Sequence, residues 1–75
     1  MFRVALHNDH VTCFEVVVHY LQTLCSFSFD DALGLTRRID QDGTADVAEL
    51  PGRDEAEQLA VAFQRRGIHA SVRTA

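Results

Sequence analysis

Three short stretches of the chain alternate between apolar and polar positions, which is the period of a β-strand with one buried face. The first stretch runs from Phe2 to His7. The second covers residues 44–50, which end at a Pro-Gly pair and whose residue types have only a weak preference for strand. In the third, Ile68, Ala70 and Val72 alternate with polar residues near the end of the sequence. We therefore expect three strands.

Two segments between the first and second strands repeat their apolar residues every three or four positions, as one face of an α-helix does. The first helix is expected to start at Cys13, because Thr12 and Glu15 form a capping-box pair around it. Its apolar face is predicted to pack in the core and consists of Phe14, Val17, Val18, Leu21, Leu24 and Cys25. The second helix is expected over residues 29–41, after a start signal at Ser28 and before a stop at Asp42-Gly43.

A third helix is expected after the Pro-Gly pair, where Ala56, Leu59 and Phe63 recur at helical spacing. Acidic residues lie near its start, two Arg residues lie in its last turn and Gly67 follows, as helix ends favour. The resulting order is β-α-α-β-α-β. It predicts a two-layer α/β (α+β) sandwich, in which a three-stranded antiparallel sheet carries three helices on one side and residues 1–75 form a single domain.

Composition and charge argue against a disordered chain, a membrane protein and a nucleic-acid-binding protein. The chain has 75 residues, of which 47% are apolar, enough for one core and too many for a disordered chain. No apolar run approaches the ~20 residues of a membrane span, so no membrane partner is expected. The net charge is -4 and the seven basic residues, all Arg, are scattered along the chain. Nucleic acid is therefore not expected as a partner.

Two further features indicate a reducing compartment. The first residues alternate in polarity instead of forming a signal peptide, so we expect a cytoplasmic protein. Cys13 and Cys25 lie twelve residues apart on one predicted helix, which is ~18 Å at the rise of an α-helix. That separation exceeds the reach of a disulfide, so both residues are expected to be thiols.

The end of the first strand and the turn after it gather two His, an Asn, an Asp and a Cys, and three chemistries compete for them. A zinc site would use His7, His10 and Cys13, with Asp9 as a further ligand. A nucleophilic enzyme would use the Cys13 thiol with His10 as its base. Recognition of a cation would use the side-chain oxygens of Asn8 and Asp9 at the mouth of a cavity between the first two helices. Spacing alone leaves these alternatives open.

Residues 4–17, with the sequence VALHNDHVTCFEVV, resemble the signature of the ClpS family. In that signature a strand runs into Asn-Asp-Asp, followed by Thr-Pro, a gate residue, Glu and an apolar pair. The resemblance continues to about residue 50, includes the Gly43-x-Ala45 that follows the second helix, and covers about two-thirds of the chain. It implies the ClpS-like sandwich fold, which the C-terminal domain of the ribosomal stalk protein shares.

ClpS proteins are adaptors of the Clp protease, so the resemblance implies a binding protein and not an enzyme. The implied partners are the N-terminal domain of a Clp AAA+ ATPase and protein substrates carrying an N-degron, which family members grip by the free α-amino group and the first side chain. The resemblance implies no cofactor and no metal ion.

The resemblance also implies a binding site. By position, Asn8 and Asp9 would hold the substrate ammonium, and Thr12 would cap the helix and shape the pocket. A hydrophobic slot for the first side chain would be lined by Phe14, Thr36, Ile39 and Ile68. Asp40 stands where the family has a pocket His, and its carboxylate would accept hydrogen bonds from the ammonium.

The chain departs from the family pattern inside this pocket. His10 stands in place of an Asp, Cys13 in place of a Pro, and Phe14 at the gate position that is often Met. Thr36 stands in place of a Met, so the slot is expected to be more polar. The first-residue preference implied by the family therefore does not carry over directly.

Departures outside the pocket affect the partner. Arg53 and Gln58 replace charged residues that face the ATPase in the family, and the mobile N-terminal extension used in delivery is not expected here. Two alternatives to the adaptor stay open. One is a protein of the ClpS fold that docks on a Clp ATPase or another protein without recognising N-termini. The other is a metal- or thiol-based protein that uses His7, His10 and Cys13.

Overall fold

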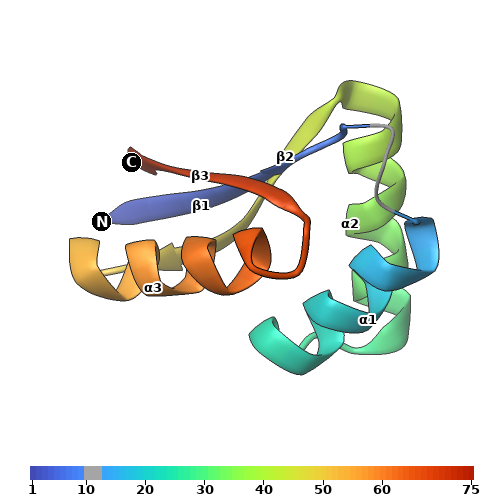
Figure 1. Cartoon of the computed structure of the whole chain (residues 1–75), viewed down its shortest axis with the longest axis horizontal. Helices are drawn as coiled ribbons and strands as arrows, with labels where there is room; N and C mark the ends of the chain where they lie inside the picture. The colour runs from blue at the N-terminus through green and yellow to red at the C-terminus, as the bar shows by residue number, and fades with distance from the viewer. Residues whose placement is uncertain (10–12) are drawn as a thin grey trace.

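Three strands and three helices make up the part of the chain that the structure describes, residues 1–9 and 13–75 of a computed structural model (Figure 1). In chain order they are β1 (Phe2–His7), α1 (Phe14–Cys25), α2 (Phe29–Asp42), β2 (Thr44–Leu50), α3 (Arg53–Gln64) and β3 (His69–Thr74). This is the predicted order, and the bounds of β1 and β2 coincide with the expected strands. None of the helices in the described residues is long and apolar enough to cross a membrane.

β1 is the central strand of the sheet, whose order is β2-β1-β3 with both pairs antiparallel. At the C-terminal end of β1, His7 lies opposite Thr44 of β2 and opposite His69 of β3. The predicted fold, a three-stranded antiparallel sheet with three helices, is confirmed. Because β1 is hydrogen-bonded along both of its edges, its end is held in place by two neighbours.

The helices cover one face of the sheet and supply most of the core. Leu6 of β1, Leu21 of α1 and Phe63 of α3 have no exposed surface and are among the largest fully buried side chains. Fully burying a side chain of this size contributes roughly 1.5 to 3 kcal/mol. The apolar face of the sheet therefore fixes where α1 and α3 lie relative to β1.

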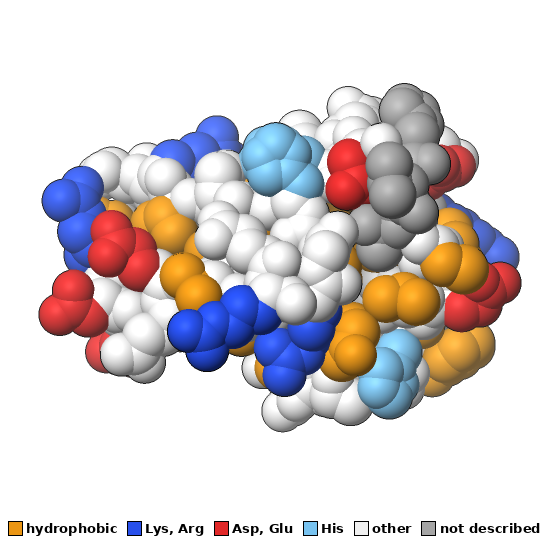
Figure 2. All heavy atoms as spheres, in the orientation of Figure 1, with side chains coloured by type: hydrophobic (Ala, Val, Ile, Leu, Met, Phe, Trp, Pro, Cys, Tyr) orange, Lys and Arg blue, Asp and Glu red, His pale blue; other side chains and the backbone are white. Residues whose placement is uncertain are grey.

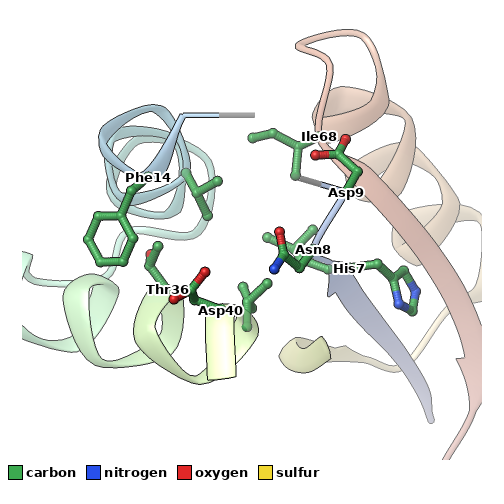
Figure 3. Close-up of a pocket in the computed structure, with 10 residues that line it drawn as sticks. His7, Asn8, Asp9, Phe14, Thr36, Asp40 and Ile68 are labelled. Atoms are coloured by element: carbon green, nitrogen blue, oxygen red, sulfur yellow. The ribbon is translucent and has the colours of Figure 1, made fainter. Parts of the chain in front are cut away.

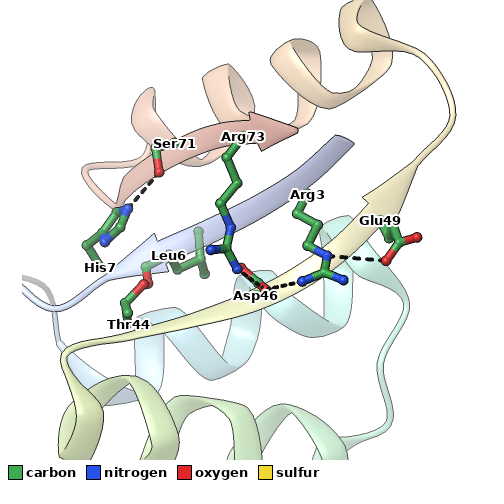
Figure 4. A network of polar contacts seen from close by, with 8 residues as sticks. All are labelled: Arg3, Leu6, His7, Thr44, Asp46, Glu49, Ser71 and Arg73. Atoms are coloured by element: carbon green, nitrogen blue, oxygen red, sulfur yellow. Dashed lines mark hydrogen bonds and ion pairs between the residues drawn. The ribbon is translucent and has the colours of Figure 1, made fainter. Parts of the chain in front are cut away.

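The other face of the sheet is open and carries polar side chains (Figure 4). The Asp46 carboxylate accepts a hydrogen bond from Arg73 at 2.5 Å and lies 3.7 Å from the Arg3 guanidinium. The Arg3 guanidinium also lies 3.4 Å from Glu49. Exposed ion pairs contribute only about 0 to 1 kcal/mol each. The ion pairs of this network therefore add little to the stability of the sheet, which comes mainly from its buried apolar face.

A β-bulge in β2 explains why its sequence lacks clean alternation. Val4 pairs with Ala48 but Ala5 pairs with Asp46, so Val47 is an extra residue on β2. The extra residue reverses which positions of β2 face the helices. Toward Leu50 the even-numbered positions face inward, whereas toward Thr44 the odd-numbered ones do.

The first helix begins one residue later than predicted. Cys13 has an extended backbone with ψ of 139°, so it occupies the N-cap position instead of the first helical turn, and its side chain makes no capping hydrogen bond. Thr12, the expected cap, lies outside the described residues. α2 starts as predicted, because the Ser28 hydroxyl oxygen accepts a hydrogen bond from the backbone N–H of Asp31 at 3.1 Å.

α2 ends at Asp42, one residue beyond the predicted end, and Gly43 caps it as part of the predicted stop. The Gly43 φ of 85° lies in the left-handed region, which costs a residue with a side chain about 1 to 2 kcal/mol. The Gly43 N–H donates to the Ile39 carbonyl at 2.9 Å, and the Gly43 carbonyl accepts from the Asn8 N–H at 2.9 Å. One residue thus closes the helix and fixes the residue that follows β1.

Cys13, at the N-cap of α1, and Cys25, its last residue, are both free thiols, as expected, and they differ in environment. Cys13 is exposed, and its thiol donates to the Glu15 carboxylate at 2.6 Å, which lowers the pKa of Glu15. Cys25 is half-buried, and the loss of hydration raises its pKa to about 11.

Alanine should have opposite effects at Gly34, in the first half of α2, and at Gly43, which follows the last residue of that helix. At Gly34 an added methyl group meets nothing within 4 Å, so Gly34→Ala should stabilise the fold by about 0.5 to 1 kcal/mol. At Gly43 the positive φ should make Gly43→Ala destabilising by about 1 to 2 kcal/mol. Thermal unfolding followed by circular dichroism should show shifts of about 4 to 8 °C per kcal/mol, upward and downward respectively. An unchanged midpoint for Gly43→Ala would contradict the left-handed turn.

Iodoacetamide should alkylate Cys13 faster than Cys25 at pH 8. Nearly all of the Cys25 thiol is protonated at that pH because its pKa is about 11, and only the thiolate reacts. Mass spectrometry of Cys13→Ser and Cys25→Ser proteins measures each rate separately, and the Cys25 rate should climb as the pH approaches 11. Equal rates at pH 8 would mean that Cys25 is not shielded from water.

Candidate functional site

The end of β1 opens into a cavity of about 260 Å³ that lies between α1, the second half of α2 and the start of β3 (Figure 3). Its lining residues are Leu6, His7, Asn8, Asp9, Phe14, Val17, Thr36, Ile39, Asp40 and Ile68. They come from separate parts of the chain, and the packing of α1 against α2, and of both helices against β2, brings them together at the end of β1. The cavity therefore depends on the core described above.

Polar side chains lie at the side of the cavity where β1 ends. The backbone of this segment is fixed, since the Asn8 N–H donates to Gly43 and the Thr44 hydroxyl donates to the Leu6 carbonyl, each at 2.9 Å. The side chains of Asn8, directly after β1, and of Asp40 on α2 point toward one another (Figure 3), and Asp9 also lines the cavity. An amide and two carboxylates thus border the cavity.

The inner wall of the cavity is apolar. Leu6, Val17, Ile39 and Ile68 are all buried core residues that also line it. Their side chains come from β1, α1, α2 and the segment before β3, so each neighbouring element supplies part of the wall. A cavity with an apolar wall and a few polar groups at one side is typical of a binding site for a small group.

Thr36, which we expected to make the slot more polar, lines the cavity and uses its hydroxyl hydrogen within its own helix. The residue is only 3% exposed, and its hydroxyl donates to the Ala32 carbonyl one turn earlier in α2 at 2.7 Å. That hydrogen bond satisfies the hydroxyl within its own helix. The hydroxyl therefore has its partner without help from a ligand.

Phe14 is not a core residue, which corrects the prediction from helical spacing. It is 37% exposed because it lies in the first turn of α1, before the helix reaches the core at Val17. Its ring lies next to α2 near Thr36, and the cavity remains open beside it (Figure 3). Phe14 also borders a shallower groove between the two helices, where Phe29 is 57% exposed.

Seven of the eight residues proposed from the sequence line one cavity: Asn8, Asp9, Phe14, Thr36, Ile39, Asp40 and Ile68. The eighth, Thr12, lies outside the described residues. Sequence reasoning missed three lining residues, Leu6, His7 and Val17. Leu6 and Val17 sit at core positions of the strand and helix patterns, which gave no sign that they also face a cavity.

The residues of the zinc and nucleophile alternatives lie apart where they are described. The His7 side chain extends away from Phe14 and α1 (Figure 3), and its Nε2 lies 2.7 Å from the Ser71 hydroxyl. The Cys13 thiol instead donates to Glu15. His10 lies outside the described residues. Within residues 1–9 and 13–75, no three His, Cys, Asp or Glu side chains are grouped so as to hold a metal ion.

A solved structure supports the fold at high similarity. The structure of Agrobacterium tumefaciens ClpS2 bound to L-phenylalaninamide matches this chain with a TM-score of 0.90 and 24% sequence identity. The match covers 96% of this chain and 93% of that one. At this identity the likeness shows a shared fold, the one that the sequence resemblance implied.

Two sequence comparisons identify the family. The family model for the ATP-dependent Clp protease adaptor protein ClpS matches residues 1–71. The chain is also 31% identical over 51 residues, or 68% of its length, to the ATP-dependent Clp protease adapter protein ClpS of Nautilia profundicola, and it spans about half of that relative, 53%. The predicted family is confirmed, and it is a family of adaptors and not of enzymes. The chain belongs to the ClpS family of Clp protease adaptors.

Proposed function

We propose that this protein binds the free N-terminus of substrate proteins in the cavity at the end of β1 and delivers them to a Clp AAA+ ATPase. The observation that carries the proposal is the pairing of two chemistries in one cavity. Hydrogen-bond acceptors border one side, and a buried apolar wall forms the other. An N-terminal residue has the matching pair, an ammonium next to a side chain.

The ammonium would be held by Asn8, Asp9 and Asp40. An ammonium has three N–H donors and no acceptor, so it suits an amide oxygen and two carboxylates. Hydrogen bonds between ionised partners are roughly twice as strong as neutral ones. Among the described lining residues there is no Lys or Arg, so no fixed cation inside the cavity competes with the ligand.

The first side chain of the substrate would rest against Leu6, Val17, Ile39 and Ile68. Burial of apolar surface there favours an apolar first residue by roughly 25 cal/mol per Å². The related ClpS2 is bound to L-phenylalaninamide, which combines a free α-amino group with an aromatic side chain. That ligand supports the same division of roles in this cavity.

Delivery would use a second surface, away from the cavity. The exposed side of α3 carries charged and apolar residues around a shallow depression, including Asp54, Glu57, Val61 and Arg65. We infer that this surface meets the N-terminal domain of the Clp ATPase. Arg53 is held over the Phe2 ring, with its guanidinium carbon 5.5 Å from the ring centre, so its charge is anchored at the edge of that surface.

Acetylating the N-terminus of a Phe-initiated peptide should lower its affinity at least tenfold. The acetyl group removes the positive charge and with it charge-assisted hydrogen bonds worth about 1.5 to 3 kcal/mol each. Isothermal titration calorimetry with the free and acetylated forms of one peptide measures the difference. Equal affinity for both forms would show that the cavity does not grip the ammonium.

A matched pair of variants on α2 locates the contact. Asp40→Asn should weaken the free peptide at least threefold, whereas Asp42→Asn removes the same charge two residues away, outside the cavity lining, and should leave affinity within a factor of two. Equal effects of the two variants would indicate a general charge effect. If no N-terminal residue binds at all, docking on an ATPase or another protein without N-terminal recognition becomes the better account.

A further inference from the structure

His7 and His69 form a pair on the open face of the sheet, on the side of β1 opposite the core. The two residues are direct partners in the antiparallel ladder between β1 and β3. Their ring centres lie 5.0 Å apart at an angle of 51°. His69 is exposed and His7 is half-buried, so both rings can be reached from solvent.

The separation of the rings suits two ligands of one metal ion. Imidazole nitrogen binds zinc at about 2.0 to 2.1 Å, and two imidazoles on a tetrahedral ion then have ring centres roughly 5 Å apart. The strands already hold His7 and His69 at that separation. Binding an ion therefore requires side-chain rotation and no movement of the backbone.

Ser71 is placed to orient the His7 ring. The His7 Nε2 lies 2.7 Å from the Ser71 hydroxyl oxygen (Figure 4). In the tautomer that donates this hydrogen bond, Nδ1 carries the lone pair that a metal needs. Metal-binding His residues commonly make such a hydrogen bond through the other ring nitrogen.

Charges on this face do not oppose a cation at the His pair. Arg73 lies on the same face of β3 as His69 and Ser71, and it is paired with the Asp46 carboxylate. Arg3 lies near both Asp46 and Glu49, so two carboxylates offset the two guanidinium groups of this network.

We propose that His7 and His69 are a binding site for an exchangeable divalent transition-metal ion such as Zn²⁺. The pair supplies two ligands and water completes the coordination, so binding is weaker than at a site with three or four protein ligands. The ion would tie β3 to the end of β1 next to Asn8. This inference does not depend on peptide binding in the cavity.

Zinc titration followed by NMR of the imidazole groups tests the proposal on the full chain. Adding Zn²⁺ at pH 7.4 should shift the ring signals of His7 and His69 together and to saturation, at concentrations that leave His19 of α1 unshifted. A shift of His10 without His69 would favour the zinc site considered from the sequence and would overturn the proposal. Shifts of all His signals in proportion would show nonspecific binding and would overturn it as well.

Matched variants give an independent readout. His69→Gln changes an exposed side chain and should weaken Zn²⁺ binding at least tenfold, whereas His19→Gln should leave it unchanged. An ion that binds only the folded protein raises its melting midpoint, so Zn²⁺ should raise the midpoint of the wild type and of His19→Gln but not of His69→Gln. If His69→Gln binds Zn²⁺ as tightly as the wild type and gains the same midpoint, the pair is not the site.

Discussion

Gly43 connects the end of α2 to the end of β1, and the site depends on that connection. Its N–H donates to the Ile39 carbonyl and its carbonyl accepts from the Asn8 N–H, both at 2.9 Å. Figure 1 shows α2 meeting the sheet at this point. Ile39 and Asp40 on the last turns of α2 are thereby fixed relative to Asn8 and Asp9. Only a residue free to adopt a positive φ can make both bonds at no steric cost.

The end of the central strand presents different chemistry on its two sides. Alternation of side chains sends Leu6 toward the helices and the cavity wall, and sends His7 toward the open face beside Ser71. Figure 2 shows apolar and charged side chains mixed across one face of the molecule, without a single dominant patch. On that face, therefore, no broad apolar patch marks a docking surface.

Most of the fold was predictable from the sequence because its signals are local and consistent. Period-two and helical patterns located all six elements, and the Ser28 and Gly43 signals located the ends of α2. The features that escaped prediction depend on tertiary context. The bulge at Val47 is set by pairing with β1, and the exposure of Phe14 is set by where α1 enters the core.

Most of the residues that line the candidate site were predictable from the sequence, but the partners of their side chains were not. The family resemblance indicated seven residues that line the cavity, because the motif fixes their order along the chain. It could not indicate that the Thr36 hydroxyl is used within α2, since that depends on rotamer and helix geometry. Nor could it indicate that His7 pairs with His69, because sequence separation hides a cross-strand neighbour.

The most direct test of the account is an NMR titration of the ¹⁵N-labelled protein with L-phenylalaninamide and with its N-acetyl form. L-phenylalaninamide should shift the backbone signals of Asn8, Asp9, Asp40, Gly43 and Ile68, while the acetylated form should leave them nearly unchanged. Shifts confined to the exposed side of α3 or to the open face of the sheet, or equal shifts from both compounds, would contradict it.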